Sequence, residues 1–148
     1  ICTLTCALKI REIQVHHILI LDNRWLIIQE YMANLRSEGQ PGIGDAFLKW
    51  VLTNWTNPQH CELVPITPQH EYPEPQMFKE FPHEDENLIH FDPSDRKFVA
   101  VALVHPEHPP ILNAVDTDWR DYQQPLAKYG VEIDFLCPDE MARHQNKS

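Results

Sequence analysis

The hydrophobic positions of the chain follow two different patterns. In five segments they recur every three to four residues, which is typical of one face of an α-helix. In four shorter segments apolar and β-branched residues follow one another directly, which is typical of a buried strand. The predicted helices cover 4–13, 23–39, 45–55, 93–104 and 119–129, and the predicted strands cover 17–21, 62–67, 111–115 and 131–136.

Helices and short strands alternate along most of the chain, which predicts an α/β domain with a mostly parallel sheet. One segment breaks the alternation. Residues 68–91 are rich in proline and acidic residues and are too long for an ordinary connection, so we interpret them as a functional loop or a flexible insertion. The predicted domain covers 1–137, and a polar C-terminal tail covers 138–148.

Composition limits the classes of function that the chain can have. Its 148 residues, 43% of them hydrophobic, suffice for one domain with its own core. No apolar stretch reaches the roughly 20 residues that span a bilayer, and no signal peptide is visible. The four cysteines have neither metal-site nor disulfide spacing, so we expect all four to be reduced and the protein to be cytoplasmic.

The net charge of −10 bears directly on nucleic-acid binding. A protein that holds nucleic acid by charge alone usually carries a basic surface. This chain would instead need cations, bound to clustered carboxylates, to reverse the local field. The placement of the carboxylates therefore decides whether nucleic acid can bind.

The sequence FDPSD at 91–95 places two carboxylates at the start of a predicted helix. Asp92 precedes a proline and has the pattern of a helix N-cap, and Asp95 stands three residues later, as in a capping box. Asp95 also heads the apolar stripe that faces the sheet, where a carboxylate needs a metal, a cation or hydrogen-bond donors. We interpret Asp92 as the cap and Asp95 as a candidate metal ligand.

Asp116 directly follows a predicted strand, at the end where ligands bind in parallel sheets. The alternative is a turn-forming residue whose carboxylate binds nearby backbone, and both interpretations stay open. Asp118 has the pattern of a helix N-cap, with Asp121 three residues later. Glu30 lies on the helix predicted over 23–39, away from the centre of its apolar stripe, so its position alone predicts a solvated surface residue.

The remaining motifs are weaker. The nine histidines include no pair with H-x3-H spacing, and the four glycines form no phosphate-cradling loop. No cysteine has an obvious electropositive setting that would make it a nucleophile. A histidine-rich metal-binding protein stays open as a third hypothesis.

Three pieces of the chain carry the candidate carboxylates in a strand–helix context. They are ILILDNRWLIIQEYMANL with Glu30, DPSDRKFVAVAL with Asp95, and ILNAVDTDW with Asp116 and Asp118. In this order they resemble the PIN domain family of metal-dependent nucleases, and the resemblance spans about 4–136. It implies a three-layer α/β/α sandwich with a mostly parallel central sheet.

The resemblance also implies a chemistry. Three or four carboxylates of the family hold one or two Mg²⁺ or Mn²⁺ ions, which activate water and stabilise the charge that develops on a phosphodiester. The activity implied is endonucleolytic cleavage of RNA, as in toxins of bacterial toxin–antitoxin pairs, with an antitoxin protein as a partner. The metal ligands implied are Glu30, Asp95 and Asp116, with Asp118 in support.

Two basic residues and one departure complete the prediction. Arg96 and Lys97 are the nearest candidates for phosphate contact, although we favour an exposed, charged helix start for both. The family begins with a central strand that ends in Asp, whereas here no Asp precedes Asp22, and Asp22 itself has the pattern of an N-cap for the helix predicted over 23–39. A shortened or degenerate member would expose unpaired strand edges and self-associate. The alternative function is therefore a non-catalytic PIN-like interaction module.

Overall fold

Two pairs of short parallel strands form the scaffold of the protein. The computed structural model describes residues 2–35, 42–70, 75–113 and 117–139. β1 (Leu19–Asp22) pairs with β2 (Cys61–Val64), and β3 (Ile111–Asn113) pairs with β4 (Ile133–Phe135). Both pairs are parallel, which confirms the α/β class and the predicted direction of the strands.

The pairs do not join into one sheet within the described residues. Their strand orders are β1-β2 and β3-β4, so β1 and β3 each keep one edge without a strand partner in that part of the chain. β2 ends at Val64 because Pro65 follows and lacks a backbone donor. The structure therefore confirms parallel pairing and leaves the single central sheet as a prediction.

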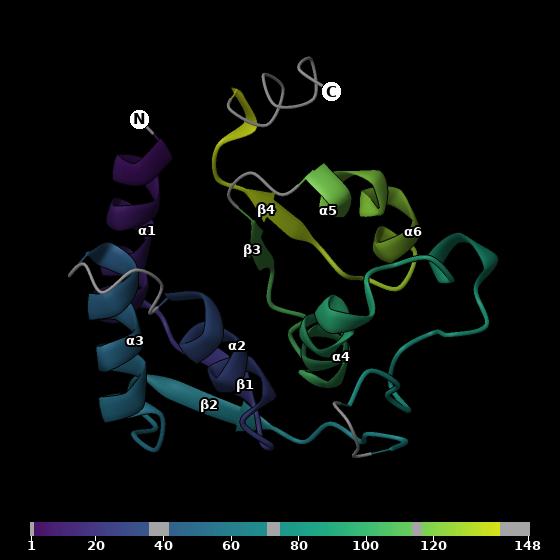
Figure 1. The fold of residues 1–148 in the computed structure, drawn as a ribbon, viewed down its shortest axis with the longest axis horizontal. Helices are drawn as coiled ribbons and strands as arrows, with labels where there is room; N and C mark the ends of the chain where they lie inside the picture. The colour runs from purple at the N-terminus through teal and green to yellow at the C-terminus, as the bar shows by residue number, and fades with distance from the viewer. Residues whose placement is uncertain (1, 36–41, 71–74, 114–116, 140–148) are drawn as a thin grey trace.

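Helices pack around the strands (Figure 1). The helix near the middle is α4, which contacts both β1 and β3. The α-helices are α1 (Cys2–His16), α2 (Leu26–Leu35), α3 (Ile43–Asn54), α4 (Arg96–Val104), α5 (Thr117–Asp121) and α6 (Gln123–Ala127). Two short 3-10 helices are η2 (Glu86–Leu88) and η3 (Pro93–Asp95).

One hydrophobic core runs through these elements. Leu21 of β1, Ile28 of α2, Val51 of α3 and Val99 of α4 are fully buried in it. Val99, Ala100, Val101 and Ala102 are consecutive buried residues, so α4 is enclosed on nearly all sides. A helix that is apolar all round is expected in such a position.

The predicted helix over 119–129 is divided into α5 and α6. Tyr122 between them has φ −105° and ψ 7°, outside helical geometry. Pro125 explains the division, because its ring would clash with the carbonyl of Asp121 in a continuous helix. In α6, Pro125 lies in the first turn, where its missing N–H costs little.

The acidic, proline-rich segment is part of the core where the structure describes it. Phe78, Phe81 and Leu88 are buried and belong to the main hydrophobic cluster. A bridge pairs Pro68 with Phe78 in antiparallel direction. The interpretation of this segment as a flexible insertion is therefore wrong for residues 75–91.

The cysteines correct a second expectation. Cys6 and Cys61 are free, and burial raises the pKa of the Cys61 thiol. Cys137 is disulfide-bonded, so the expectation that all four are reduced is wrong. In the described part of the chain, no helix is long and apolar enough to cross a membrane. The predicted helix end at Gly39 and the tail over 140–148 lie outside the described residues.

Candidate functional site

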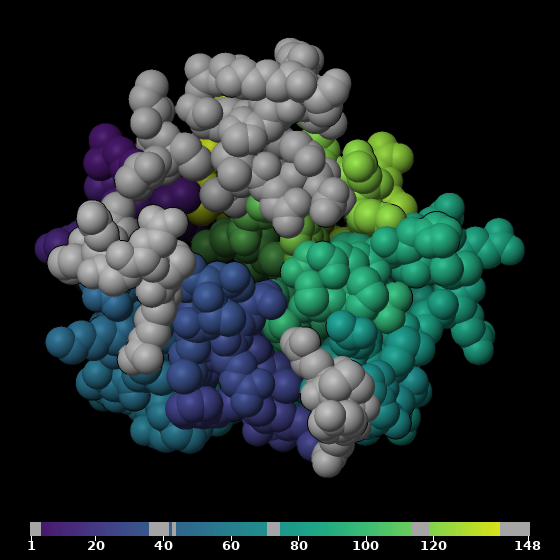
Figure 2. All heavy atoms as spheres, viewed as in Figure 1, coloured from purple at the N-terminus to yellow at the C-terminus, as the bar shows by residue number. Residues whose placement is uncertain are grey.

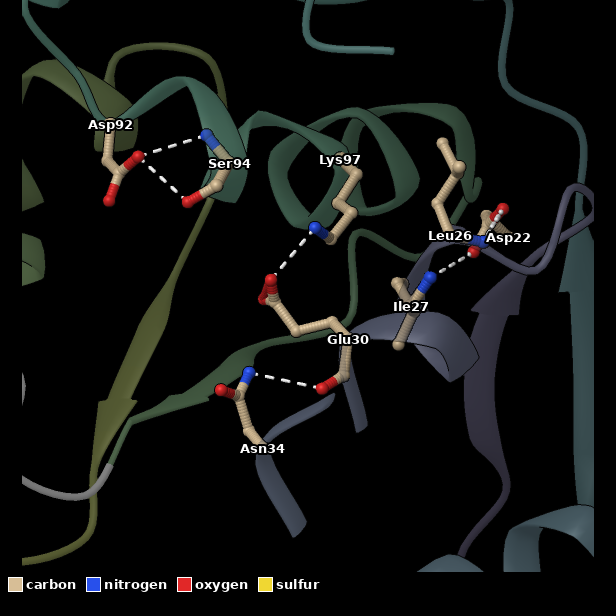
Figure 3. A network of polar contacts seen from close by, with 8 residues as sticks. All are labelled: Asp22, Leu26, Ile27, Glu30, Asn34, Asp92, Ser94 and Lys97. Atoms are coloured by element: carbon tan, nitrogen blue, oxygen red, sulfur yellow. Dashed lines mark hydrogen bonds and ion pairs between the residues drawn. The ribbon is translucent and has the colours of Figure 1, made fainter. Parts of the chain in front are cut away.

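Asp22 ends β1 and caps α2. Its carboxylate accepts hydrogen bonds from the backbone N–H groups of Arg24 (2.8 Å), Leu26 (3.1 Å) and Ile27 (2.9 Å), and the side chain is fully buried. Figure 3 shows the carboxylate turned toward the first turn of α2. Because three donors occupy it, Asp22 is a structural cap, as predicted, and its charge is balanced by the helix start.

The start of α4 separates the two carboxylates of FDPSD. Asp92 accepts hydrogen bonds from the backbone N–H (3.0 Å) and hydroxyl (2.8 Å) of Ser94, so its prediction as a cap is confirmed. Asp95 is half-buried at the N-cap position of α4, yet its side chain makes no capping hydrogen bond. Asp95 therefore does not cap α4 through its side chain.

Glu30 and Lys97 join α2 to the start of α4. The Lys97 Nζ lies 3.0 Å from the Glu30 Oε1, and the two side chains are 3% and 23% exposed. Figure 3 shows both side chains reaching into the space between the two helices. In the space-filling view α2 lies against α4 along the front of the molecule (Figure 2). Lys97 is two positions after Asp95 in the sequence. The contact therefore brings Glu30, a predicted metal ligand on α2, to the start of α4, where Asp95 also lies.

The surface prediction for Glu30 and the exposed-helix prediction for Lys97 are both wrong, for one reason. A helical wheel with one apolar stripe assumes that a helix packs on one side only. α2 packs on β1 and α3 with that stripe and meets α4 with another side. Glu30 falls on the second side, where it is half-buried and where Lys97 compensates its charge.

Arg96 turns away from Lys97 toward the segment 75–91. Its guanidinium donates to the carbonyls of Gln76 and Ile89 at 3.4 Å each, contacts the Met77 Sδ at 3.2 Å and lies 5.5 Å from the Phe81 ring centre. Desolvation lowers the pKa of Arg96 without neutralising it. Among the described residues, its Nε is the one buried side-chain polar atom without a hydrogen-bond partner. Arg96 therefore anchors this segment.

The remaining predicted ligands lie at the end of β3. Asp116 lies outside the described residues, and α5 contains Asp118. The preceding Asn113 is buried at the last position of β3. Within the described ranges, no three His, Cys, Asp or Glu side chains form a group that could hold a metal. The structure thus brings Glu30 to the start of α4, where Asp95 lies. It defines no distance from Glu30 or Asp95 to Asp116.

The phenol of Tyr31, next to Glu30 in α2, responds to its surroundings. Desolvation, and after it the charges of Glu30, Cys61 and Asp22, raise the pKa of Tyr31 well above its usual range. The neighbouring carboxylate thus makes ionisation of this phenol still harder. Lys97 supplies the cation that balances Glu30 from within the chain.

A separate hollow of about 520 Å³ lies against the segment 75–91. Its lining includes Lys79, His83, Asp85 and Tyr129 and none of the predicted ligands. The Tyr129 hydroxyl donates to Asp85, which lowers the pKa of that carboxyl and raises the pKa of the phenol. This hollow is open and polar, and it is distinct from the Glu30–Lys97 contact.

Comparison of the chain with protein-family models, with curated proteins and with solved structures gives no match.

Proposed function

We propose that this protein is a PIN-type nuclease domain that hydrolyses RNA phosphodiesters with a divalent metal. The observation that carries the proposal is the Glu30–Lys97 contact. It joins the acidic helix that follows the first strand to the helix that starts at Asp95, in the order that the resemblance requires. The two parallel strand pairs would then belong to one central sheet of a three-layer sandwich.

The donor set fits Mg²⁺ or Mn²⁺ in its chemistry. Both ions prefer carboxylate oxygens and retain several waters, so two or three protein ligands suffice. Lys97 engages the Glu30 Oε1, which leaves Oε2 for a second cation. Asp95 is half-buried at the start of α4, two residues before Lys97, which contacts Glu30. We assign Glu30, Asp95 and Asp116 as ligands, with Asp118 in support.

The proposed metal ligands and Lys97 would have different roles. The bound metal would activate water and stabilise the charge that develops on the phosphodiester. Glu30 and Asp95 would bind it from α2 and from the start of α4. Lys97 would hold Glu30 against α4 and fix its orientation, which makes it a positioning residue. Phosphate contact by Arg96 and Lys97 stays a prediction. Both side chains already have partners within the fold.

A second candidate function has its own supporting observation. The Lys97 ammonium already balances Glu30, which a buried carboxylate also needs in a protein without metal. A non-catalytic PIN-like interaction module would use Lys97 as a permanent substitute for the cation. Under that proposal, the protein would bind a partner without cleaving RNA. Under the first, an antitoxin-type inhibitor is the expected protein partner.

Cleavage of single-stranded RNA with Mn²⁺ separates these functions. We expect the wild type to cleave and Asp95→Asn to lose at least about 100-fold in rate, since it removes one metal ligand. Asp92→Asn is the matched control three residues away, because asparagine retains the cap. Equal rates in wild type and Asp95→Asn would refute the assignment. No cleavage by the folded wild type would favour the non-catalytic module.

A further inference from the structure

Helix α1 has apolar residues on two opposite sides. Ile10 packs against the hydrophobic core, and Ile13 is half-buried. On the other side, Leu4, Leu8 and Val15 are 63%, 60% and 65% exposed, and Ile18 just beyond the helix is 49% exposed. These four are most of the large hydrophobic residues that are exposed in the described part of the chain. Exposed apolar residues grouped on one side of a helix in this way indicate an interaction site.

The outer residues have the spacing of a helix–helix seam. Positions 4, 8, 11, 15 and 18 are separated by alternating steps of four and three, as in the contact line of two packed helices. Arg11 holds the middle position, and Glu12 lies next to it. Both are exposed, so the seam is apolar at its ends and charged at its centre. We name this line, 4, 8, 11, 15 and 18, the α1 seam.

The α1 seam is complementary to itself in antiparallel orientation. When Leu8 of one copy lies opposite Val15 of a second copy, Arg11 of the first lies opposite Glu12 of the second. A two-fold axis repeats each of these contacts, as in an isologous interface. Opposite charges at the centre then fix the register, and the apolar pairs on either side supply the buried area.

The charge of α1 also suits contact between two copies. The chain carries a net charge of −10, which opposes self-association over most of its surface. In contrast, α1 holds Lys9 and Arg11 against the single acid Glu12. Glu12 is already placed by contacts with Lys9 (3.7 Å) on its own helix and with His17 (3.1 Å) just beyond it, and the His17 hydrogen bond leads the causes that lower its pKa. The Glu12 carboxylate therefore lies as an anion beside the central residue of the seam, Arg11.

We propose that the α1 seam binds a second copy of this chain, with the two α1 helices antiparallel and Arg11 paired with Glu12 across a two-fold axis. One helix pair is at the small end of specific interfaces, so the dissociation constant is in roughly the micromolar range. This proposal is independent of the nuclease function.

Sedimentation velocity over a concentration series tests the proposal. We expect a reversible wild-type dimer that Leu8→Glu abolishes. Arg11→Glu and Glu12→Arg should each weaken it by about tenfold or more, and the double reversal should restore it to within about threefold. Circular dichroism checks that each variant keeps its helix, because Glu12→Arg also removes contacts within α1. Ile89→Glu, at an exposed apolar residue outside the seam, is the control that should leave the dimer unchanged.

Each contrary result overturns the proposal. A wild type that stays monomeric up to about 200 μM has no self-complementary seam of the expected strength. A dimer that survives Leu8→Glu uses another surface. If both single reversals weaken the dimer and the folded double reversal does not restore it, the antiparallel Arg11–Glu12 register is wrong.

Discussion

Arg96 and Lys97 are neighbours in sequence, yet they hold two different regions against α4. Lys97 faces α2, and its Nζ lies 3.0 Å from the carboxylate of Glu30. Arg96 faces the segment 75–91 and makes several longer contacts of 3.2–3.4 Å, mostly with neutral groups. The first region is fastened by a charge pair, and the second by an aromatic surface and weak hydrogen bonds.

The difference predicts how the two sides behave. A buried charge pair resists separation, because each partner would lose its compensating charge. Long hydrogen bonds to carbonyls are weaker, and the buried Arg96 Nε has no partner among the described residues. We therefore expect the α2–α4 contact to open only with global unfolding and the segment 75–91 to open locally.

The largest effect should follow Lys97→Met. Methionine fills the space but removes the cation, which leaves the Glu30 carboxylate half-buried without its partner. We expect the free energy of unfolding to fall by about 2–3 kcal/mol, below the range for fully buried pairs because Glu30 reaches solvent. Urea denaturation measures this, and a loss below about 0.5 kcal/mol would mean that the contact contributes nothing.

A double-mutant cycle with Glu30→Gln sharpens the assignment to this pair. We expect the loss of unfolding free energy in the double variant to be smaller than the sum of the two single losses. The difference is the coupling energy of the pair, which should be about 1–2 kcal/mol. Lys49→Met with Gln29→Glu provides a cycle of exposed residues as a control. Strict additivity at Glu30 and Lys97 would show that each acts through other neighbours.

Arg96→Met should have a smaller and more local effect. We expect a loss of about 1 kcal/mol, since the weak hydrogen bonds disappear while the stem still packs. Native-state hydrogen exchange should accelerate at Phe78 and Phe81 and stay unchanged at Ile27 and Ile28. Equal acceleration on both sides of α4 would contradict the division into two regions.

The smallest effect is a pH dependence at His83. The His83 Nε2 lies 3.0 Å from both the backbone N–H and the carbonyl oxygen of Phe78, and it accepts from the N–H only when it is unprotonated. Desolvation first, and then the charge of Arg96, lower the pKa of His83 below 6.5, against the hydrogen bond with Phe78. This contribution to stability is present above pH 6.5 and is lost as the pH falls through the folded pKa. In His83→Gln, the free energy of unfolding should no longer fall over this pH range. If the dependence of stability on pH is the same in the variant as in the wild type, His83 is excluded as its source.

Much of the fold could be predicted because its signals are local. The spacing of apolar residues predicted the order of helices and strands. The prediction of Asp92 as a helix cap is confirmed by the hydrogen bonds that its carboxylate accepts from Ser94. The prediction of Asp22 as a cap is confirmed in the same way, by the hydrogen bonds that its carboxylate accepts from the first N–H groups of α2. A carboxylate before an apolar helix meets the first free N–H groups whatever the rest of the chain does.

The errors come from contacts between distant segments. Glu30 and Lys97 lie 67 positions apart, so no helical wheel could show that each needs the other. The burial of Phe78 in a proline-rich segment likewise depends on which neighbours cover it. The division at Tyr122 was readable from Pro125, since the effect of proline on the preceding turn is local.

Titration calorimetry with Mn²⁺ tests the central claim most directly. We compare the wild type, the Asp95→Asn plus Asp116→Asn double variant, and the Asp92→Asn control. The account predicts saturable binding by the wild type and the control, and loss of at least about tenfold in affinity in the double variant. Binding of equal affinity in all three proteins would contradict the assignment of these carboxylates as metal ligands.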